Sequence, residues 1–320
     1  MISILIPVYN ESPNIAPMCA RIREVSLTWE LPFELIFVND ASTDDTADLI
    51  KAEIDQDARI SLIQLSRNFG HQAAISAGIK HSKGDGVVLM DGDMQDPPEV
   101  ISTFIQKWKE GNQVVYGIRT KRKEPFFLRL SYSVFYRLLS RIGDIDIPID
   151  SGDFCLMDRK VVNVIVHQMP EQIRFIRGLR AYSGFKQIGV EFERAERLNG
   201  EPKYTQRKLA RLAADGLFGF STFPLRLASY IGLIVSIGSF MVGVFFIVHR
   251  IVDFKLFGYS PADVPGLASL AVGLFFLFGI TLMILGIIGE YIGRIYMEVK
   301  KRPQYVIGEI VTQSSLASEN

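Results

Sequence analysis

The hydrophobic positions of the first 116 residues form short β-branched runs separated by longer stretches with helical spacing. The short runs are residues 2–7, 33–38, 60–65, 86–90 and 113–116. The stretches with helical spacing are residues 14–27, 43–54, 71–81 and 98–109. Strands that alternate with helices in this way form a mostly parallel sheet wrapped by helices. The pattern therefore predicts an α/β fold for this part of the chain.

Two segments further along are apolar throughout and long enough to cross a membrane. Residues 227–248 and 267–289 contain no charged side chain, and a helix needs roughly 20 residues to span a bilayer core. The connector between them is short and contains Pro261 and Pro265, so we expect a hairpin of two transmembrane helices. The alternative is a pair of buried core helices, which their length and the lack of a polar face disfavour.

Basic residues cluster on the outer flanks of the two spans rather than in their connector. The flanking positions are Lys203, Arg207, Lys208, Arg211, Arg226, Arg294, Lys300, Lys301 and Arg302. The connector carries only Arg250 and Lys255, which Asp253 and Asp263 offset. Because Lys and Arg accumulate on the cytoplasmic side of a membrane, we expect both termini in the cytoplasm.

These observations divide the chain into successive parts. Residues 1–199 are expected to form a cytoplasmic domain, and residues 200–226 an amphipathic region that lies in the membrane interface. Residues 227–249 and 267–289 are the expected transmembrane helices, joined by a short non-cytoplasmic loop. Residues 290–320 are expected to form a cytoplasmic tail.

Charge and cysteine content exclude some classes of function. The formal net charge is zero, so no bulk electrostatic field favours binding to nucleic acid. The cysteines, Cys19 and Cys155, lie far apart in the sequence and outside any CxxC spacing. A disulfide framework or a zinc site is therefore not expected, and ordinary packed thiols in a reducing compartment are.

Polar residues follow four of the predicted strands at the points where the strands end. They are residues 7–11, 39–46, 67–71 and 91–96. Parallel sheets bind ligands at the carboxyl ends of their strands, so these clusters predict one site at that edge. Helix capping alone is the alternative, and Asp44 and Thr46 suit it. No GxGxxG follows a strand, so a dinucleotide site is not supported.

The cluster that indicates the most specific chemistry is Asp91-Gly92-Asp93. Two carboxylates separated by a small residue suit a hard divalent cation that takes phosphate oxygens as its remaining ligands. Such an ion neutralises a diphosphate leaving group. The amide of Gln95 supplies a further candidate oxygen ligand. The predicted cofactor is Mg²⁺ or Mn²⁺.

Three motifs carry a resemblance to a known family: residues 6–11, 38–46 and 91–99. In this order, and with the membrane hairpin, the chain resembles the family-2 glycosyltransferases of the GT-A fold. More narrowly it resembles the polyprenyl-phosphate glycosyltransferases, including bacterial polyprenyl-phosphate glucosyltransferases and dolichol-phosphate mannose synthase. The resemblance implies a cytoplasmic GT-A catalytic domain at residues 1–199 of an integral protein of a bacterial-type cytoplasmic (inner) membrane.

The activity that the resemblance implies is inverting transfer of a hexose, foremost glucose from UDP-glucose, to an undecaprenyl-type polyprenyl phosphate. Other donors, such as GDP-mannose or a UDP-amino sugar, stay open. A processive polysaccharide synthase is disfavoured because neither Trp29 nor Trp108 lies in a QxxRW motif. A non-enzymatic scaffold is disfavoured by the intact DxD. The expected partners are the nucleotide sugar, the polyprenyl phosphate and membrane lipids, and self-association is left open.

The resemblance also assigns roles at the donor side. The positions matching nucleotide-sugar-binding residues of the family are Pro7, Tyr9, Glu11, Asp40 and Asp91. Asp40 matches the aspartate that accepts a hydrogen bond from the nucleobase. The positions matching metal ligands are Asp91, Asp93 and Gln95.

On the acceptor side, Arg119 follows the fifth predicted strand, and Arg129 and Ser133 begin a polar row that recurs every four residues of an apolar helix. A basic row on an apolar helix suits a phosphate that carries a hydrocarbon tail. A surface helix with solvated arginines is the alternative. In related mannose synthases, residues that match Arg119, Arg129 and Ser133 hold the lipid phosphate, and Lys203 is a further candidate.

Asp153 lies in a segment that resembles the acceptor end of the family's active site. We predict two catalytic residues, Asp153 and Asp93. Because a phosphate monoester is already largely anionic near neutral pH, the reaction has little need of a general base. Asp153 is therefore expected to orient acceptor or sugar, and the roles of general base and of turn residue stay open.

Overall fold

The computed structural model describes residues 1–119, 151–172, 174–193, 223–252 and 266–316. The chain folds as two compact units. One comprises Met1–Phe220 together with Lys301–Asn320, and the other comprises Ser221–Lys300. The C-terminal segment therefore belongs to the same unit as the N-terminal domain.

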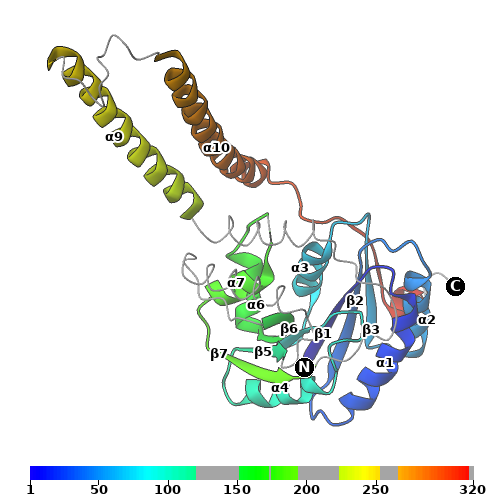
Figure 1. Ribbon diagram of the computed structural model, residues 1–320. Coiled ribbons are helices and arrows are strands. Elements are labelled where there is room, and N and C mark those ends of the chain that lie inside the picture. Colours follow the sequence, from blue (N-terminus) through cyan, green and yellow to red (C-terminus); the bar gives the residue numbers. More distant parts are fainter. Residues whose placement is uncertain (120–150, 173, 194–222, 253–265, 317–320) are drawn as a thin grey trace. The chain divides into compact units, whose positions relative to one another are not determined.

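The first unit is built on one sheet, in which eight strands of the described residues take part (Figure 1). The strands are β1 (Ile2–Val8), β2 (Phe33–Asn39), β3 (Ile60–Leu65), β4 (Gly86–Leu89), β5 (Val114–Arg119), β6 (Ser151–Asp158), β7 (Gln187–Phe192) and β8 (Ile307–Val311). Their spatial order is β7-β5-β6-β4-β1-β2-β3-β8. Strand β1 is parallel to β2 and β4, β2 is parallel to β3, and β5 is parallel to β7. The antiparallel strands are β6, which lies between β4 and β5, and β8, which lies outside β3.

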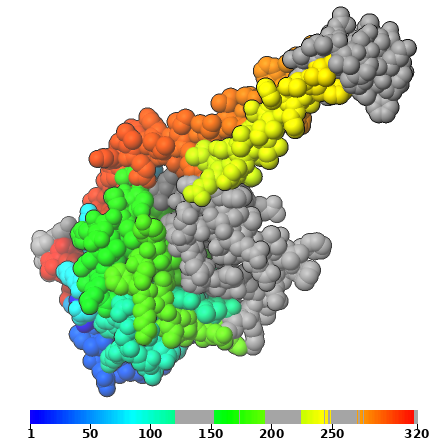
Figure 2. Space-filling view, turned by 90° about the vertical axis from the view of Figure 1, so that its left-hand side faces the viewer, coloured from blue at the N-terminus to red at the C-terminus, as the bar shows by residue number. Residues whose placement is uncertain are grey.

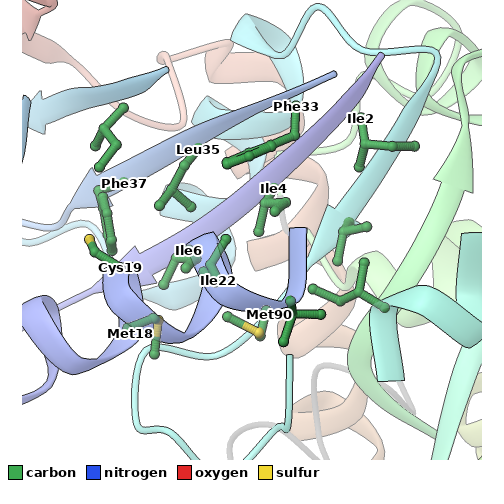
Figure 3. Packing of buried hydrophobic residues seen from close by; sticks show 14 of the residues in the cluster. Ile2, Ile4, Ile6, Met18, Cys19, Ile22, Phe33, Leu35, Phe37 and Met90 are labelled. Atoms are coloured by element: carbon green, nitrogen blue, oxygen red, sulfur yellow. The ribbon is translucent and has the colours of Figure 1, made fainter. Parts of the chain in front are cut away.

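Helices cover both faces of this sheet. Helices α1 (Ser12–Ser26), α2 (Thr46–Gln56) and α4 (Val100–Lys109) pack on one face. Helices α3 (His71–His81), α6 (Arg159–His167) and α7 (Ile176–Tyr182) pack on the other. Strand β1 is consequently buried on both sides. Its even-numbered isoleucines pack with Met18 and Ile22 of α1 (Figure 3), while Leu5 belongs to the opposite core. Burial on both faces explains why the first strand is a continuous apolar run rather than an alternating one.

The two cysteines are buried free thiols in separate cores. Cys19 lies in the core beneath α1, and Cys155 lies in the core beneath α3. Burial raises the pKa of Cys19 to about 12. Both are packed, unreactive thiols, as the sequence predicts.

The predicted α/β class is confirmed, and β1–β5 and helices α1–α4 occur where the hydrophobic pattern places them, with ends that shift by a few residues. The antiparallel strands β6 and β8 were not predicted. They pair with strands that are distant in sequence, and such pairing leaves no local periodicity to read.

The segment after the second predicted span differs from the expected tail. Helix α10 (Gly266–Lys300) continues beyond residue 289, and the chain then forms β8 and the short helix α11 (Gln313–Leu316). Strand β8 pairs with β3, Val311 is 1% exposed, and the Gln313 side chain donates to the Asp55 carbonyl over 3.1 Å. The C-terminal residues thus complete the edge of the sheet.

We expect deletion of residues 306–320 from the full chain to destabilise the first unit. Burial of a valine such as Val311 contributes roughly 2 kcal/mol, so the midpoint of thermal unfolding should fall by at least about 5 °C. A fragment that ends at residue 199 would lack β8 as well and should share the defect. The matched control deletes only residues 317–320 and keeps β8. Equal unfolding midpoints for both deletions would contradict a structural role for this strand.

The second unit contains the two apolar helices. Helix α9 (Phe223–Val252) and α10 lie side by side in Figures 1 and 2. A Cβ at Gly232 of α9 would lie 3.8 Å from Ile284 Cδ1 of α10. Both helices are long and apolar enough to cross a membrane, with windows at Pro224–Val242 and Phe276–Lys300 that are 6% and 0% buried. Their exposure argues against the alternative of core helices, because a core helix is buried by its own domain.

Candidate active site

The loop that carries the DxD motif lies against the end of β1. A Cβ at Gly92 would approach Val8 Cγ1 to 2.9 Å and the Pro7 carbonyl oxygen to 3.1 Å. A larger residue would therefore push Asp91 and Asp93 away from β1. The close packing explains why a glycine separates the carboxylates, and it brings the DxD beside the first polar cluster.

The first two polar clusters are joined by hydrogen bonds between their loops. The Asn10 amide N–H donates to Ser42 Oγ over 2.9 Å, and Asn10 Oδ1 accepts the Thr43 N–H over 2.8 Å. The Glu11 N–H donates to Thr46 Oγ1 over 2.9 Å. These bonds hold the ends of β1 and β2 as one structured rim. Tyr9 in this rim is 38% exposed, so its ring is accessible to a ligand.

Asp40 at the end of β2 holds the loop that follows β3. Its Oδ1 accepts the Phe69 N–H over 2.7 Å, and its Oδ2 accepts the Gly70 N–H over 2.8 Å. The residue is 4% exposed. Burial raises the pKa of Asp40, while the two backbone N–H groups act in the opposite sense. Each carboxylate oxygen thus has one protein donor and retains capacity for a second.

His71 opens α3 and lies between the carboxylates of Asp91, just after β4, and Asp153, on the neighbouring strand β6. Its Nε2 is 3.6 Å from Asp91 Oδ1 and 3.5 Å from Asp153 Oδ2. Burial opposes protonation of the ring, but the interaction with Asp153 and the charge of Asp91 outweigh it and raise the pKa of His71. The imidazole therefore connects the metal-side carboxylate with the predicted acceptor-side carboxylate.

Asp153 is paired with an arginine of α7. Arg177 Nε donates to Asp153 Oδ1 over 2.7 Å, and Arg177 Nη2 donates to Asp153 Oδ2 over 2.9 Å. Burial favours the neutral acid, but the charge of Arg177 and the interactions with His71 hold the pKa of Asp153 well below its ordinary value. Asp153 is therefore an ionised carboxylate at neutral pH. This fork–fork geometry is the strongest form of arginine–carboxylate pairing.

The residues around Asp93 fit the predicted divalent cation. Asp93 Oδ1 accepts the Gln95 N–H over 3.2 Å, which tightens the turn after Asp93. Met94 in that turn has a φ of 62° and a buried side chain. Among the described residues, no group of at least three His, Cys, Asp or Glu side chains forms a metal cluster. A two-carboxylate site is incomplete alone, and phosphate oxygens are the ligands that complete such sites.

Arg119 reaches the same edge of the sheet from the end of β5. Its Nη2 lies 3.7 Å from Asp96 Oδ1, and the Asp96 side chain is fully buried. The guanidinium also covers Gly152, where a Cβ would lie 3.3 Å from Arg119 Nη2. The side chain is 21% exposed. It therefore lies between the loop after the DxD and the start of β6, where Asp153 is found.

The comparison with known proteins agrees with this geometry. Residues 3–166 match the family model of glycosyl transferase family 2. The chain is 46% identical, over 99% of its length and 95% of the relative's, to an uncharacterized glycosyltransferase of Bacillus subtilis (strain 168). It belongs to glycosyl transferase family 2. It is also 39% identical to the prophage bactoprenol glucosyl transferase homolog of Escherichia coli (strain K12), over 97% of this chain and 99% of that one. The identity to the bactoprenol glucosyl transferase of Shigella phage SfII is 40%, over 96% of this chain and 97% of that one.

Family-2 membership and the mixed sheet together confirm the predicted GT-A fold class, and the chain is a glycosyltransferase. Among solved structures, mannosyl-3-phosphoglycerate synthase from Rubrobacter xylanophilus is similar at 16% identity. That match covers 67% of this chain and 70% of that one, with a TM-score of 0.46.

The structure brings most of the predicted site residues of this glycosyltransferase to one edge of the sheet. They are Pro7, Tyr9, Glu11, Asp40, Asp91, Asp93, Gln95, Arg119 and Asp153. Arg129, Ser133 and Lys203 lie outside the described residues, and so does the predicted amphipathic region except for its last residues. The roles of all these residues stay predictions.

Arg177 is the residue of this site that the sequence analysis missed. Arg174, Arg177 and Arg180 recur at every third position of an otherwise apolar segment. Arginines on the apolar side of a helix are rarely buried without a partner, and this spacing is the signal that would have indicated an acidic partner. The partner itself, Asp153, is not visible in that pattern.

Proposed function

We propose that this glycosyltransferase transfers glucose from UDP-glucose to a polyprenyl phosphate, with inversion at the anomeric carbon. The observation that carries the proposal is the 39% identity to the bactoprenol glucosyl transferase homolog, which extends over 97% of the chain and thus includes both apolar helices. Bactoprenol is a polyprenol, so its phosphate is the acceptor chemistry that these relatives imply.

The donor is proposed to bind where β1, β2 and β4 end. Pro7, Tyr9, Glu11 and Asp40 hold the nucleoside, and Asp91 lies close to the ribose and diphosphate. Asp91, Asp93 and Gln95 hold Mg²⁺ or Mn²⁺, which when bound neutralises the charge of the diphosphate leaving group. The support is the joined rim of the first two loops and the contact of Gly92 with the end of β1.

The acceptor phosphate is proposed to bind Arg119, with Arg129, Ser133 and Lys203 as further contacts. A phosphate oxygen of the acceptor attacks the anomeric carbon. The new carbon–oxygen bond forms as the bond from that carbon to the diphosphate oxygen breaks, and UDP leaves. An α-linked donor then yields a β-linked lipid phosphosugar. Arginine suits this role because its planar fork binds phosphate through paired, charge-assisted hydrogen bonds.

Asp153 is proposed to orient the reacting groups rather than to accept a proton. A carboxylate whose pKa is held well below its ordinary value is a weak base. The attacking phosphate carries no proton that must be removed. An ionised, arginine-bound Asp153 is suited instead to accepting a hydrogen bond from a sugar hydroxyl.

We further propose that both helices span the cytoplasmic membrane and that the catalytic unit lies on its cytoplasmic face. The basic flanks of the spans support this orientation. The return of the chain to β8 gives independent support, because the sheet contains residues from both sides of the hairpin. A chain that leaves a domain and returns to it crosses a membrane an even number of times.

The test is incubation of the purified full chain with labelled nucleotide sugars and polyprenyl phosphate in detergent. We expect label from UDP-glucose in a lipid-soluble product that releases glucose on mild acid treatment. A lipid product from GDP-mannose or a UDP-amino sugar but not from UDP-glucose would support polyprenyl phosphate as the acceptor and refute glucose as the transferred sugar. No lipid product with any donor would refute the proposed acceptor.

We expect Asp40→Ala to weaken UDP binding about tenfold, because a nucleobase N–H would lose its acceptor. The substitution also leaves the Phe69 and Gly70 N–H groups without their carboxylate, so thermal unfolding must be measured beside calorimetry of UDP, GDP and CDP. A lowered unfolding midpoint with unchanged UDP affinity would make Asp40 a loop anchor only. Equal affinity of the parent protein for the three nucleotides would also contradict the assignment.

A further inference from the structure

The Asp91 and Asp153 carboxylates lie near each other, Asp91 just after the end of β4 and Asp153 on the neighbouring strand β6. Strands β4 and β6 are antiparallel, and Leu89 is paired with Cys155. Continued by two residues, this register sets Asp91 opposite Asp153. The positions of His71 Nε2, 3.6 Å from one carboxylate and 3.5 Å from the other, agree with that register. Two adjacent carboxylates repel each other, so their geometry depends on the cations beside them.

Arg177 supplies the closest of these cations to Asp153. Its fork engages both carboxylate oxygens, at 2.7 Å and 2.9 Å. A bidentate fork fixes the plane of the carboxylate as well as its position. Oδ2 also lies 3.5 Å from His71 Nε2, which in turn is 3.6 Å from Asp91 Oδ1. Asp153 thus presents one defined edge to the place where the donor diphosphate and sugar are proposed to bind.

Helix α7, which carries Arg177, is fixed to the same elements. The Ile176 N–H donates to Gln72 Oε1 over 2.9 Å, and Gln72 follows His71 in the first turn of α3. Ile176 and Leu179 are 2% and 1% exposed in the core beneath α3. The first turn of α3 therefore makes two contacts: Gln72 binds the start of α7, and His71 lies between the carboxylates of Asp91 and Asp153.

A purely stabilising ion pair is the alternative explanation. The desolvation of two charges offsets much of their attraction, so a buried pair is weak evidence for a contribution to stability. The Arg177–Asp153 pair is also incompletely buried, with side-chain exposures of 21% and 8%. It lies at the one edge of the sheet where the polar clusters gather, rather than inside a core.

We propose that Arg177 is a positioning residue for sugar transfer, which acts by holding Asp153 in one orientation beside Asp91. This inference rests on the proposed function, in which Asp153 orients the sugar. Arg177 then contributes to turnover through its bidentate contact with Asp153. Loss of Arg177 lets the carboxylate rotate and removes its directed hydrogen bond, while the sites for nucleoside and lipid phosphate are unaffected.

A double-mutant cycle with Asp153→Asn and Arg177→Ala tests this dependence. The measured quantity is UDP release from UDP-glucose by the full chain, with and without polyprenyl phosphate. We expect Arg177→Ala to lower kcat about tenfold, with the KM for UDP-glucose changed by less than about threefold, as is typical of groups in contact. In the Asp153→Asn background the same substitution should have almost no further effect. Equal effects in both backgrounds would overturn the inference.

Two further variants separate positioning from folding. Arg177→Lys keeps a charge but not the fork, and it should fold normally and retain a kcat between those of the parent and Arg177→Ala. A kcat equal to that of the parent would show that the fork is not needed. Arg159→Ala is the matched control, since Arg159 lies at the opposite end of β6 and donates to the Gly84 carbonyl over 2.8 Å. It should leave kcat unchanged; a loss equal to that of Arg177→Ala would show a general effect of removing an arginine.

The proposed function and the inference fail in different ways. If polyprenyl phosphate does not stimulate UDP release by the parent protein, the proposed acceptor is wrong. The coupling between Arg177 and Asp153 is then measured on the basal release of UDP. Strong coupling there supports the positioning role for another acceptor, and its absence overturns it.

Discussion

Asp93→Ala is expected to abolish nearly all sugar transfer without unfolding the domain. Asp93 is half-buried in the turn after β4, where Gly92 packs on the end of β1. Its carboxylate is a proposed metal ligand, and a metal that stabilises a diphosphate leaving group contributes several kcal/mol to the transition state. A loss of about 4 kcal/mol corresponds to a roughly thousandfold fall in kcat. The measurement is UDP release at saturating Mg²⁺ or Mn²⁺, beside a thermal unfolding curve.

The control for this prediction is an aspartate at the other end of the same strand. Asp85 precedes β4, is 75% exposed and pairs with the N-terminal amine over 2.8 Å. Asp85→Ala should leave kcat within about twofold, because exposed pairs contribute little. The parent protein should also lose activity in excess chelator and regain it when Mg²⁺ or Mn²⁺ is added. Full turnover in excess chelator would contradict the metal assignment whatever the variants do.

The parts of the fold that the sequence predicts are those with local signals. Strands β1 to β4 are buried runs that end in polar clusters, and each is followed by a helix with its own periodicity. The parallel order brings the carboxyl ends of neighbouring strands to one edge. The gathering of Asp40, Asp91 and Asp93 at that edge was therefore predictable without any contact being known.

The parts that were not predictable depend on contacts between distant residues. Strand β8 at Ile307–Val311 pairs with β3, although the two apolar helices lie between them in the sequence. The five-residue strand has no feature that distinguishes it from a tail. The pairing of Arg177 with Asp153 likewise joins a helix to a strand through side chains alone, and sequence spacing does not encode such a contact.

Asp40 illustrates a different limit. The family resemblance singles out the residue for nucleobase binding, but it does not reveal that both carboxylate oxygens already accept backbone N–H groups of the loop after β3. A residue that a motif assigns to the ligand can thus also hold a neighbouring loop in place. The effect of Asp40→Ala must therefore be interpreted both as the loss of a loop anchor and as the loss of the proposed nucleobase contact.

Arg119→Ala is expected to lower the catalytic efficiency with polyprenyl phosphate by roughly ten- to hundredfold. A charge-assisted hydrogen bond to phosphate contributes about 1.5–3 kcal/mol, and each 1.36 kcal/mol is tenfold in rate. The KM for UDP-glucose should change by less than about threefold, because the proposed donor residues lie at the ends of β1, β2 and β4. Arg119→Lys should recover part of the loss, since it keeps the charge but not the planar fork. The measurement is initial rate against polyprenyl phosphate at saturating donor.

The proximity of Arg119 to Asp96 supplies the competing explanation and the means to test it. The buried Asp96 carboxylate lies 3.7 Å from the guanidinium, so removal of Arg119 also removes a neighbouring cation from a buried anion. Such a loss destabilises a protein irrespective of substrate. Asp96→Asn removes that charge, so Arg119→Ala in this background should regain thermal stability. If Arg119 binds the acceptor phosphate, the double variant remains defective toward polyprenyl phosphate although it is stable. If the catalytic efficiency with polyprenyl phosphate recovers together with thermal stability, the role of Arg119 is to balance the charge of Asp96, and other residues bind the acceptor phosphate.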